Sequence, residues 1–289
     1  MREQFSFEDL LQKYEAALDK LVSWNVRIAP SSRLCQYAER LRQAIDNPNS
    51  QAPSGFLYQL MFDLREIDEI IEIASSFTKY PTHKELKKLR WLPKGGRHPD
   101  DENDSRARDI QYELYLRAVF RRSGVSIDVG DDEQGEPDLI VQSYPLEAKR
   151  PKSRERLEKC LSEAVKQLNR QKLPGVIAIS LDQVIRPRHH YISATTIDEV
   201  EQAVRDEFDL FRYENASKIK RLIENSNVAA IAYTLRNPAE VPSPSDTMSS
   251  FLGIDSLIHV DAFLREADPH FEIVEIFKRV LETLHSAPI

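Results

Sequence analysis

The chain has 289 residues, of which 41% are hydrophobic and 30% charged, and it carries a net charge of −7. This composition is ordinary for a globular protein, and no apolar run approaches membrane-spanning length. The net negative charge argues against a protein whose whole surface is basic for nonspecific binding of nucleic acid. Two cysteines, Cys35 and Cys160, are too few and too far apart for a disulfide framework or a zinc site.

The first residues lack the apolar core of a signal peptide, so we expect a cytoplasmic protein with no membrane partner. Helical patterns then fill the N-terminal third, over residues 7–24, about 32–45, 56–77 and 82–91. The last of these begins with a capping box, Thr82 followed by Glu85. The sequence therefore predicts a small helical bundle over residues 1–95, and a linker rich in Gly, Pro and acidic residues follows it.

The rest of the chain, residues 105–289, alternates between helix and strand patterns. Helices are predicted over 109–124, with Gly124 as the C-cap, and over 153–171, 197–211, 216–224 and 271–285. Strands are predicted over 125–129, 138–142, 146–149, 176–181 and 228–235, with an edge strand over 256–263 and a loop over 238–246. This order indicates an α/β fold with helices on the faces of a sheet.

Two of these strands carry polar groups suited to holding a divalent cation. Asp138 opens one strand, and Glu147 and Lys149 share a face of the next because side chains alternate along a strand. If the strands pair as a hairpin, two carboxylates and an ammonium converge. Glu85 and Lys87 have the same spacing as Glu147 and Lys149, but they lie in a helical pattern that indicates a solvated helix turn.

The segment from Asp109 to Asn169 resembles the PD-(D/E)XK nuclease superfamily in the order of its elements and in these residues. The resemblance implies a mixed sheet flanked by helices, with a restriction-endonuclease-like core, and Glu113 matches the acidic residue of the family's first helix. Some members also carry Gln-x-x-x-Tyr on the crossover helix; this chain has Gln167 but Gln171 in place of the tyrosine.

The resemblance implies a Mg²⁺ site, with Mn²⁺ able to substitute. Asp138, Glu147 and the backbone carbonyl of Ala148 would bind the ion, because Mg²⁺ prefers few carboxylates together with waters and phosphate oxygens. Lys149 would orient or deprotonate the attacking water. Glu113 would reach the metal through water or help to bind a second ion.

Basic residues are concentrated just after this motif. The predicted phosphate contacts are Arg150, Lys152, Arg154, Lys166 and Gln167. A second basic cluster comprises Lys84, Lys87, Lys88, Arg90, Lys94 and Arg97. For both clusters the alternative is an ordinary solvated helix face. The acidic group that includes Asp131 and Glu136 is interpreted as a polar turn, and Tyr112 and Tyr115 as packing residues.

The predicted function is that of a metal-dependent nuclease acting on DNA or RNA, with DNA favoured. The alternative is a non-catalytic nucleic-acid-binding or regulatory module on a degenerate nuclease fold. The N-terminal helical region would dock a regulatory protein, as would suit an effector of a bacterial anti-phage defence system, a suggestion that rests on analogy.

Overall fold

The protein has a mixed α/β fold, seen in a computed structural model that describes residues 7–47, 56–97, 106–131, 134–185, 192–242 and 250–286. Within these residues one sheet contains β1 (Ile127–Val129), β2 (Leu139–Val141), β3 (Tyr144–Lys149), β4 (Gly175–Ser180), β5 (Ile192–Ser193), β6 (Val228–Pro242) and β7 (Ser250–Ala262). The strand order is β1-β2-β3-β4-β6-β5, and β7 pairs with β6. None of the described helices is both long and apolar enough to cross a membrane.

The first four helices are α1 (Phe7–Ser23), α2 (Arg33–Asp46), α3 (Phe56–Ser75) and α4 (His83–Leu89). Their starts follow the local sequence: the Ser32 side chain accepts a hydrogen bond from the Cys35 N–H, and Thr82 and Glu85 form the predicted capping box. All four helices that the sequence predicts here are therefore confirmed, with α4 shorter than expected.

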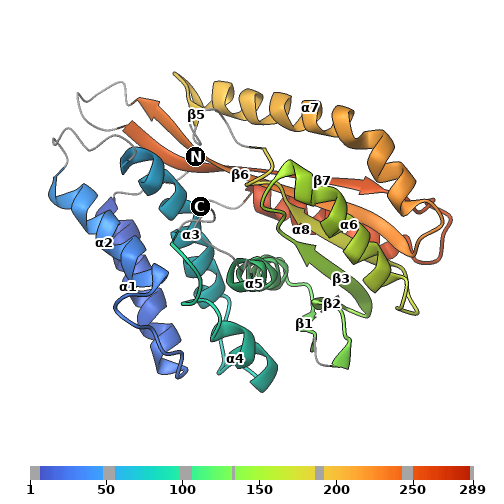
Figure 1. Cartoon of the computed structure of the whole chain (residues 1–289), viewed down its shortest axis with the longest axis horizontal. Coiled ribbons are helices and arrows are strands. Elements are labelled where there is room, and N and C mark those ends of the chain that lie inside the picture. Colours follow the sequence, from blue (N-terminus) through green and yellow to red (C-terminus); the bar gives the residue numbers. More distant parts are fainter. Residues whose placement is uncertain are drawn as a thin grey trace.

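Helix α5 (Arg106–Arg122) joins the helical region to the sheet. All its side chains from Ile110 to Phe120 are buried, and Figure 1 shows it end-on between α3 and the strands. After it, Gly124 adopts a φ of 73°, which favours glycine, in agreement with its predicted place beyond the helix end. One hydrophobic cluster runs from α1, α2 and α3 through α5 into the sheet and α8 (Glu272–Ser286), so the packing is continuous across the predicted boundary at residues 95–105.

Strands β1 (Ile127–Val129), β2 (Leu139–Val141) and β3 (Tyr144–Lys149) form an antiparallel meander. Helix α6 (Arg154–Leu168) then crosses over to β4 (Gly175–Ser180), which is parallel to β3. Strand β5 (Ile192–Ser193) and helix α7 (Ile197–Ile223) follow. Leucine side chains of α6 and phenylalanine side chains of α7 form a second hydrophobic cluster with one face of β4 and β6, opposite the face that α5 covers.

Two predictions for the C-terminal part were wrong. The helices predicted over 197–211 and 216–224 are the single helix α7, and the loop predicted over 238–246 is strand as far as Pro242, in β6 (Val228–Pro242). Strand β7 (Ser250–Ala262) pairs antiparallel with β6 from Ala230 to Pro242. This continuous ladder outweighs the local turn preference of the prolines, since backbone pairing along the whole strand compensates for them.

Candidate functional site

The β2–β3 hairpin brings Asp138, Glu147 and Lys149 together. The two strands are joined by a two-residue turn, in which Gln142 has a φ of 58°, and Leu139 is paired with Leu146. Continuing this register by one residue sets Asp138 opposite Glu147, on the same face of the sheet. Lys149 Nζ donates to Glu147 Oε2 at 2.8 Å and to Asp138 Oδ2 at 3.2 Å. The convergence predicted from strand alternation is therefore present in the structure.

The Asp138 carboxylate also ties the hairpin together, since its Oδ2 accepts a hydrogen bond of 2.8 Å from the Ala148 backbone N–H. Glu147 and Lys149 are paired with Ile177 and Ile179 of β4, whose side chains pack with α6 and α7. The site therefore lies on the α6 face of the sheet, at the end where β2 begins and β3 finishes.

Two acidic groups in close contact shift the ionisation of this site. Burial of Glu147, and then the charge of the Asp138 carboxylate beside it, raise the pKa of Glu147 to about 7. Burial disfavours the charge on Lys149, but Asp138 and Glu147 outweigh this effect and raise the pKa of Lys149. The site thus holds two carboxyl groups in close contact, and a positive charge nearby favours their ionised form.

Glu113 approaches the same region from α5, and its partner was not foreseen. Lys88 of α4 donates to the Glu113 carboxylate, and the same Lys88 Nζ lies 3.5 Å from the Asp138 backbone oxygen. A signal was available in the sequence. Lys88 is three residues after Glu85 and precedes Leu89, and on a helix these positions share a face; all three side chains are buried.

The other lysines of α4 contact the connection between β1 and β2. Lys84 Nζ lies 2.7 Å from Glu136 Oε2, and Lys87 Nζ lies 3.8 Å from Asp131 Oδ1. Glu136 also accepts a hydrogen bond from the Asp131 backbone N–H, as a polar turn would require. These lysines of the second basic cluster are thus engaged by carboxylates of the protein.

Arg150 does not fit its predicted place on a phosphate-binding surface. Its side chain is 1% exposed and donates to Glu69 at 3.1 Å and to Glu66 at 3.2 Å, both on α3, and it lies 3.5 Å from Asp182. It follows Lys149 directly, and successive strand side chains point to opposite faces. The physical reason is therefore alternation: Lys149 faces the site, whereas Arg150 points toward α3.

The remaining predicted phosphate contacts lie on or just before α6. Arg154 and Lys166 are exposed, whereas Lys152 and Gln167 are half-buried. Arg154 also donates to Glu214 of α7 at 3.0 Å. Tyr112 and Tyr115 are buried in the core, in line with the packing role predicted for them, and the Tyr112 hydroxyl lies 2.9 Å from the Thr234 hydroxyl.

The site chemistry fits one divalent cation that keeps several waters. Among the described residues, no three or more His, Cys, Asp and Glu side chains are grouped as a ready set of metal ligands. Asp138 and Glu147 supply two close carboxylates, and the Ala148 carbonyl is the neighbouring neutral oxygen in the chain. Two carboxylates with waters and substrate phosphate are what Mg²⁺ ordinarily accepts.

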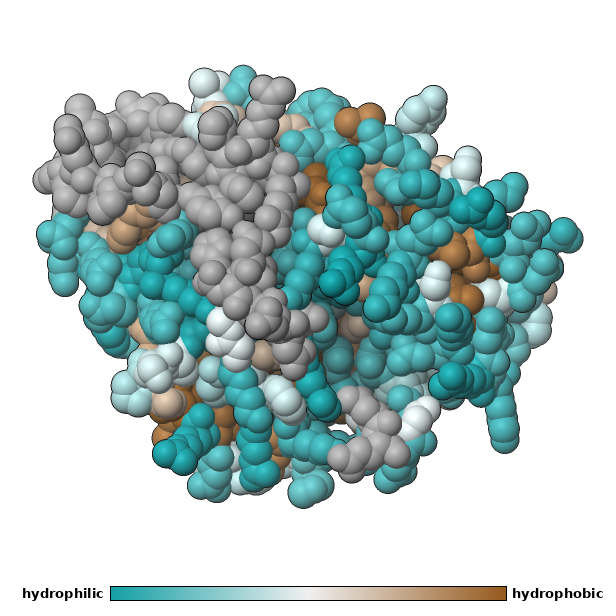
Figure 2. Space-filling model, viewed as in Figure 1, coloured by the Kyte–Doolittle hydropathy of each residue, from teal (hydrophilic) through white to brown (hydrophobic). Residues whose placement is uncertain are grey.

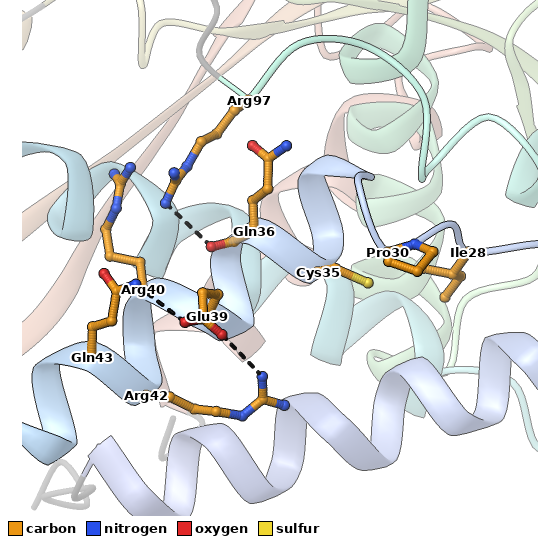
Figure 3. A pocket seen from close by; sticks show the side chains of 9 residues that line it. All are labelled: Ile28, Pro30, Cys35, Gln36, Glu39, Arg40, Arg42, Gln43 and Arg97. Carbon is orange, nitrogen blue, oxygen red and sulfur yellow. Dashed lines mark hydrogen bonds and ion pairs between the residues drawn. The ribbon is translucent and has the colours of Figure 1, made fainter.

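A separate cavity of about 410 Å³ lies beside α2. Figure 3 shows the arginines that line it, Arg40, Arg42 and Arg97, and Arg42 forms an ion pair with Glu39 there. Arg40 and Arg97 both lie within 3.4 Å of Asp63, so the two guanidiniums share one buried carboxylate of the protein. None of the site residues on β2, β3 or α5 lines this cavity.

On the face shown in Figure 2, hydrophilic side chains predominate and hydrophobic ones form small separate groups.

No protein-family model matches the chain, and no curated protein matches it.

Proposed function

We propose that this protein is a Mg²⁺-dependent nuclease that hydrolyses phosphodiester bonds, with DNA preferred over RNA. The observation that carries the proposal is the convergence of Asp138, Glu147 and Lys149 at one end of the β2–β3 hairpin, with Lys149 Nζ within 3.2 Å of both carboxylates. Three paired antiparallel strands, a crossover helix and a parallel strand are also the order of elements expected of a restriction-endonuclease-like core.

Each residue has a task that its position allows. Asp138, Glu147 and the Ala148 carbonyl would hold the cation, which when bound supplies positive charge at the scissile phosphate. The Asp138 carboxylate is oriented by the Ala148 N–H. Lys149 would hold the attacking water by a hydrogen bond and balance the phosphate charge. The exposed Arg154 and Lys166 would contact the nucleic-acid backbone.

Cleavage assays with matched lysine variants test the proposal. Purified protein is incubated with plasmid DNA, linear DNA and structured RNA, in Mg²⁺, in Mn²⁺ and in EDTA. We expect metal-dependent cutting that falls at least about 100-fold in Lys149→Met, because removing one positioned donor that stabilises developing charge costs roughly 10²–10³-fold. Lys159→Met is the control, since Lys159 is an exposed α6 residue 3.8 Å from Glu163.

Circular dichroism and thermal unfolding establish that both variants are folded. Cutting that persists in EDTA, or that is equal in Lys149→Met and Lys159→Met, would contradict the proposal. If folded wild-type protein cuts no substrate but retains DNA in a gel-shift assay, the alternative of a non-catalytic module on the same fold replaces it.

A further inference from the structure

We infer that Lys88 is a further residue of this site, and that its ammonium takes the place beside Glu113 that a second cation would need, so that the site binds one divalent cation. The inference rests on the proposed function and assigns a new role to each partner. Glu113 becomes a positioning residue for Lys88 rather than a metal ligand.

The burial of the pair is the first argument. The Lys88 and Glu113 side chains are 7% and 8% exposed, and they form an ion pair. Removing one partner of a buried ion pair is strongly destabilising, because a charge is left without compensation. A cation that bound Glu113 would have to separate this buried pair. A cation that bound Asp138 and Glu147 would instead displace Lys149, whose side chain is more exposed than that of Lys88.

The second argument is how firmly α4 holds Lys88 in place. Glu85, one turn earlier, forms an ion pair with buried Arg117 of α5 and closes the capping box with Thr82. On the outer side of α4, Lys84 and Lys87 pair with the β1–β2 connection. The helix is thus fastened to α5 and to the segment that leads into Asp138. Lys88 is brought into the site by the fold itself.

Charge balance is the third argument. Among the described residues named here, the ionised carboxylates of Asp138, Glu147 and Glu113 and the ammoniums of Lys149 and Lys88 sum to one negative charge. One divalent cation and one phosphodiester bring the sum to zero. A second cation would leave two uncompensated positive charges in a largely buried site, which is unfavourable. The residues present therefore match one cation and one phosphate.

Counting bound Mn²⁺ tests the inference without relying on activity. The free ion is followed by electron paramagnetic resonance as it is titrated into wild-type protein and variants. We expect one bound ion in the wild type, affinity at least about 10-fold weaker in Asp138→Asn, and still one ion in Glu113→Gln. Lys88→Met removes the ammonium that occupies the place beside Glu113, so this variant should bind two ions, and adding Glu113→Gln should return the number to one. Lys84→Met, on the same helix, should bind one.

Two ions in the wild type with one lost in Glu113→Gln would overturn the inference while leaving the metal site intact. One ion in folded Lys88→Met would overturn it as well. Should Lys88→Met fail to fold, the comparison of wild type with Glu113→Gln decides the matter alone. Failure of the proposed function is distinct: no Mn²⁺ bound by the wild type, or binding unchanged in Asp138→Asn, removes the site and the inference with it.

Discussion

Replacing Arg150 by methionine would separate a core role from a nucleic-acid-binding role. Methionine keeps an unbranched apolar side chain of similar length but removes the guanidinium. Three buried carboxylates, Glu66, Glu69 and Asp182, then lose a partner. If Arg150 instead contacted phosphate, the change would weaken binding to DNA and leave the stability of the protein nearly unaltered.

The expected loss of stability depends on the ion pairs that each carboxylate retains. Glu66 retains Arg33 at 3.0 Å, and Glu69 retains Arg236 at 3.3 Å. Loss of one partner from a buried ion pair costs about 3–5 kcal/mol, and the remaining arginines place Arg150→Met near the lower end. We therefore expect the free energy of unfolding to fall by about 3 kcal/mol, a large share of the roughly 5–15 kcal/mol typical of a domain.

Urea unfolding at pH 7 is the assay, with Arg42→Met as the matched control. The Arg42 side chain is 45% exposed, and its ion pairs with Glu15 and Glu39 lie at the surface, where such a pair contributes at most about 1 kcal/mol. Equal losses of stability in Arg150→Met and Arg42→Met, or a loss of DNA affinity in Arg150→Met without a loss of stability, would refute the reasoning.

Glu85→Gln should destabilise the protein by about 2–4 kcal/mol at pH 7, since Arg117 loses its buried partner. Burial opposes the charge of Glu85, but hydrogen bonds from Thr82 and the charge of Arg117 lower its pKa below the usual value, so its contribution is present above that value and is lost as the pH falls. The difference in free energy of unfolding between wild type and Glu85→Gln, measured with urea, should therefore be smaller at pH 3 than at pH 7. An equal difference at the two pH values would count against this account. Gly130→Ala places a methyl group far inside contact distance of the Pro137 carbonyl oxygen, so the backbone that carries Asp138 must move, and Mn²⁺ affinity should fall at least about 10-fold. Gly135→Ala is the control: a methyl group there has no neighbour within contact distance, and at a φ of 69° the change should lower the free energy of unfolding by about 1 kcal/mol and leave Mn²⁺ affinity unchanged. Equal Mn²⁺ affinity in the two variants would show that Gly130 does not position the site.

The hairpin that carries the candidate site could be predicted because its determinants are local. Alternation puts Glu147 and Lys149 on one face, and Pro145 and Pro151 exclude a long helix through them. Asp138 precedes an apolar run that pairs in the register expected for a tight turn. The same rule also separates Arg150 from Lys149, and the prediction that made Arg150 a phosphate contact followed the basic run rather than the alternation.

Lys88 and the C-terminal elements depended on contacts distant in the sequence. The spacing of Lys88 with Leu89 places it on the apolar side of α4, but nothing local shows that α4 packs beside the site. Helix α7 continues through Tyr213 and Asn215 because no Gly or Pro interrupts it there, although its hydrophobic pattern weakens. Pro238 suggested a loop, yet pairing with β7 carries β6 past it.

The burial of α5 from Ile110 to Phe120 has a consequence for how the protein unfolds. Its backbone hydrogen bonds can reach solvent only when the cluster it shares with α1, α2, α3 and the sheet separates. Amide hydrogens in the middle of α5 should therefore exchange with deuterium at rates set by global unfolding, whereas those of the exposed turns of α6 and α7 should exchange through local opening. A ligand that binds at the hairpin would then slow exchange in α1 as well as at the site, since both belong to one cooperative unit.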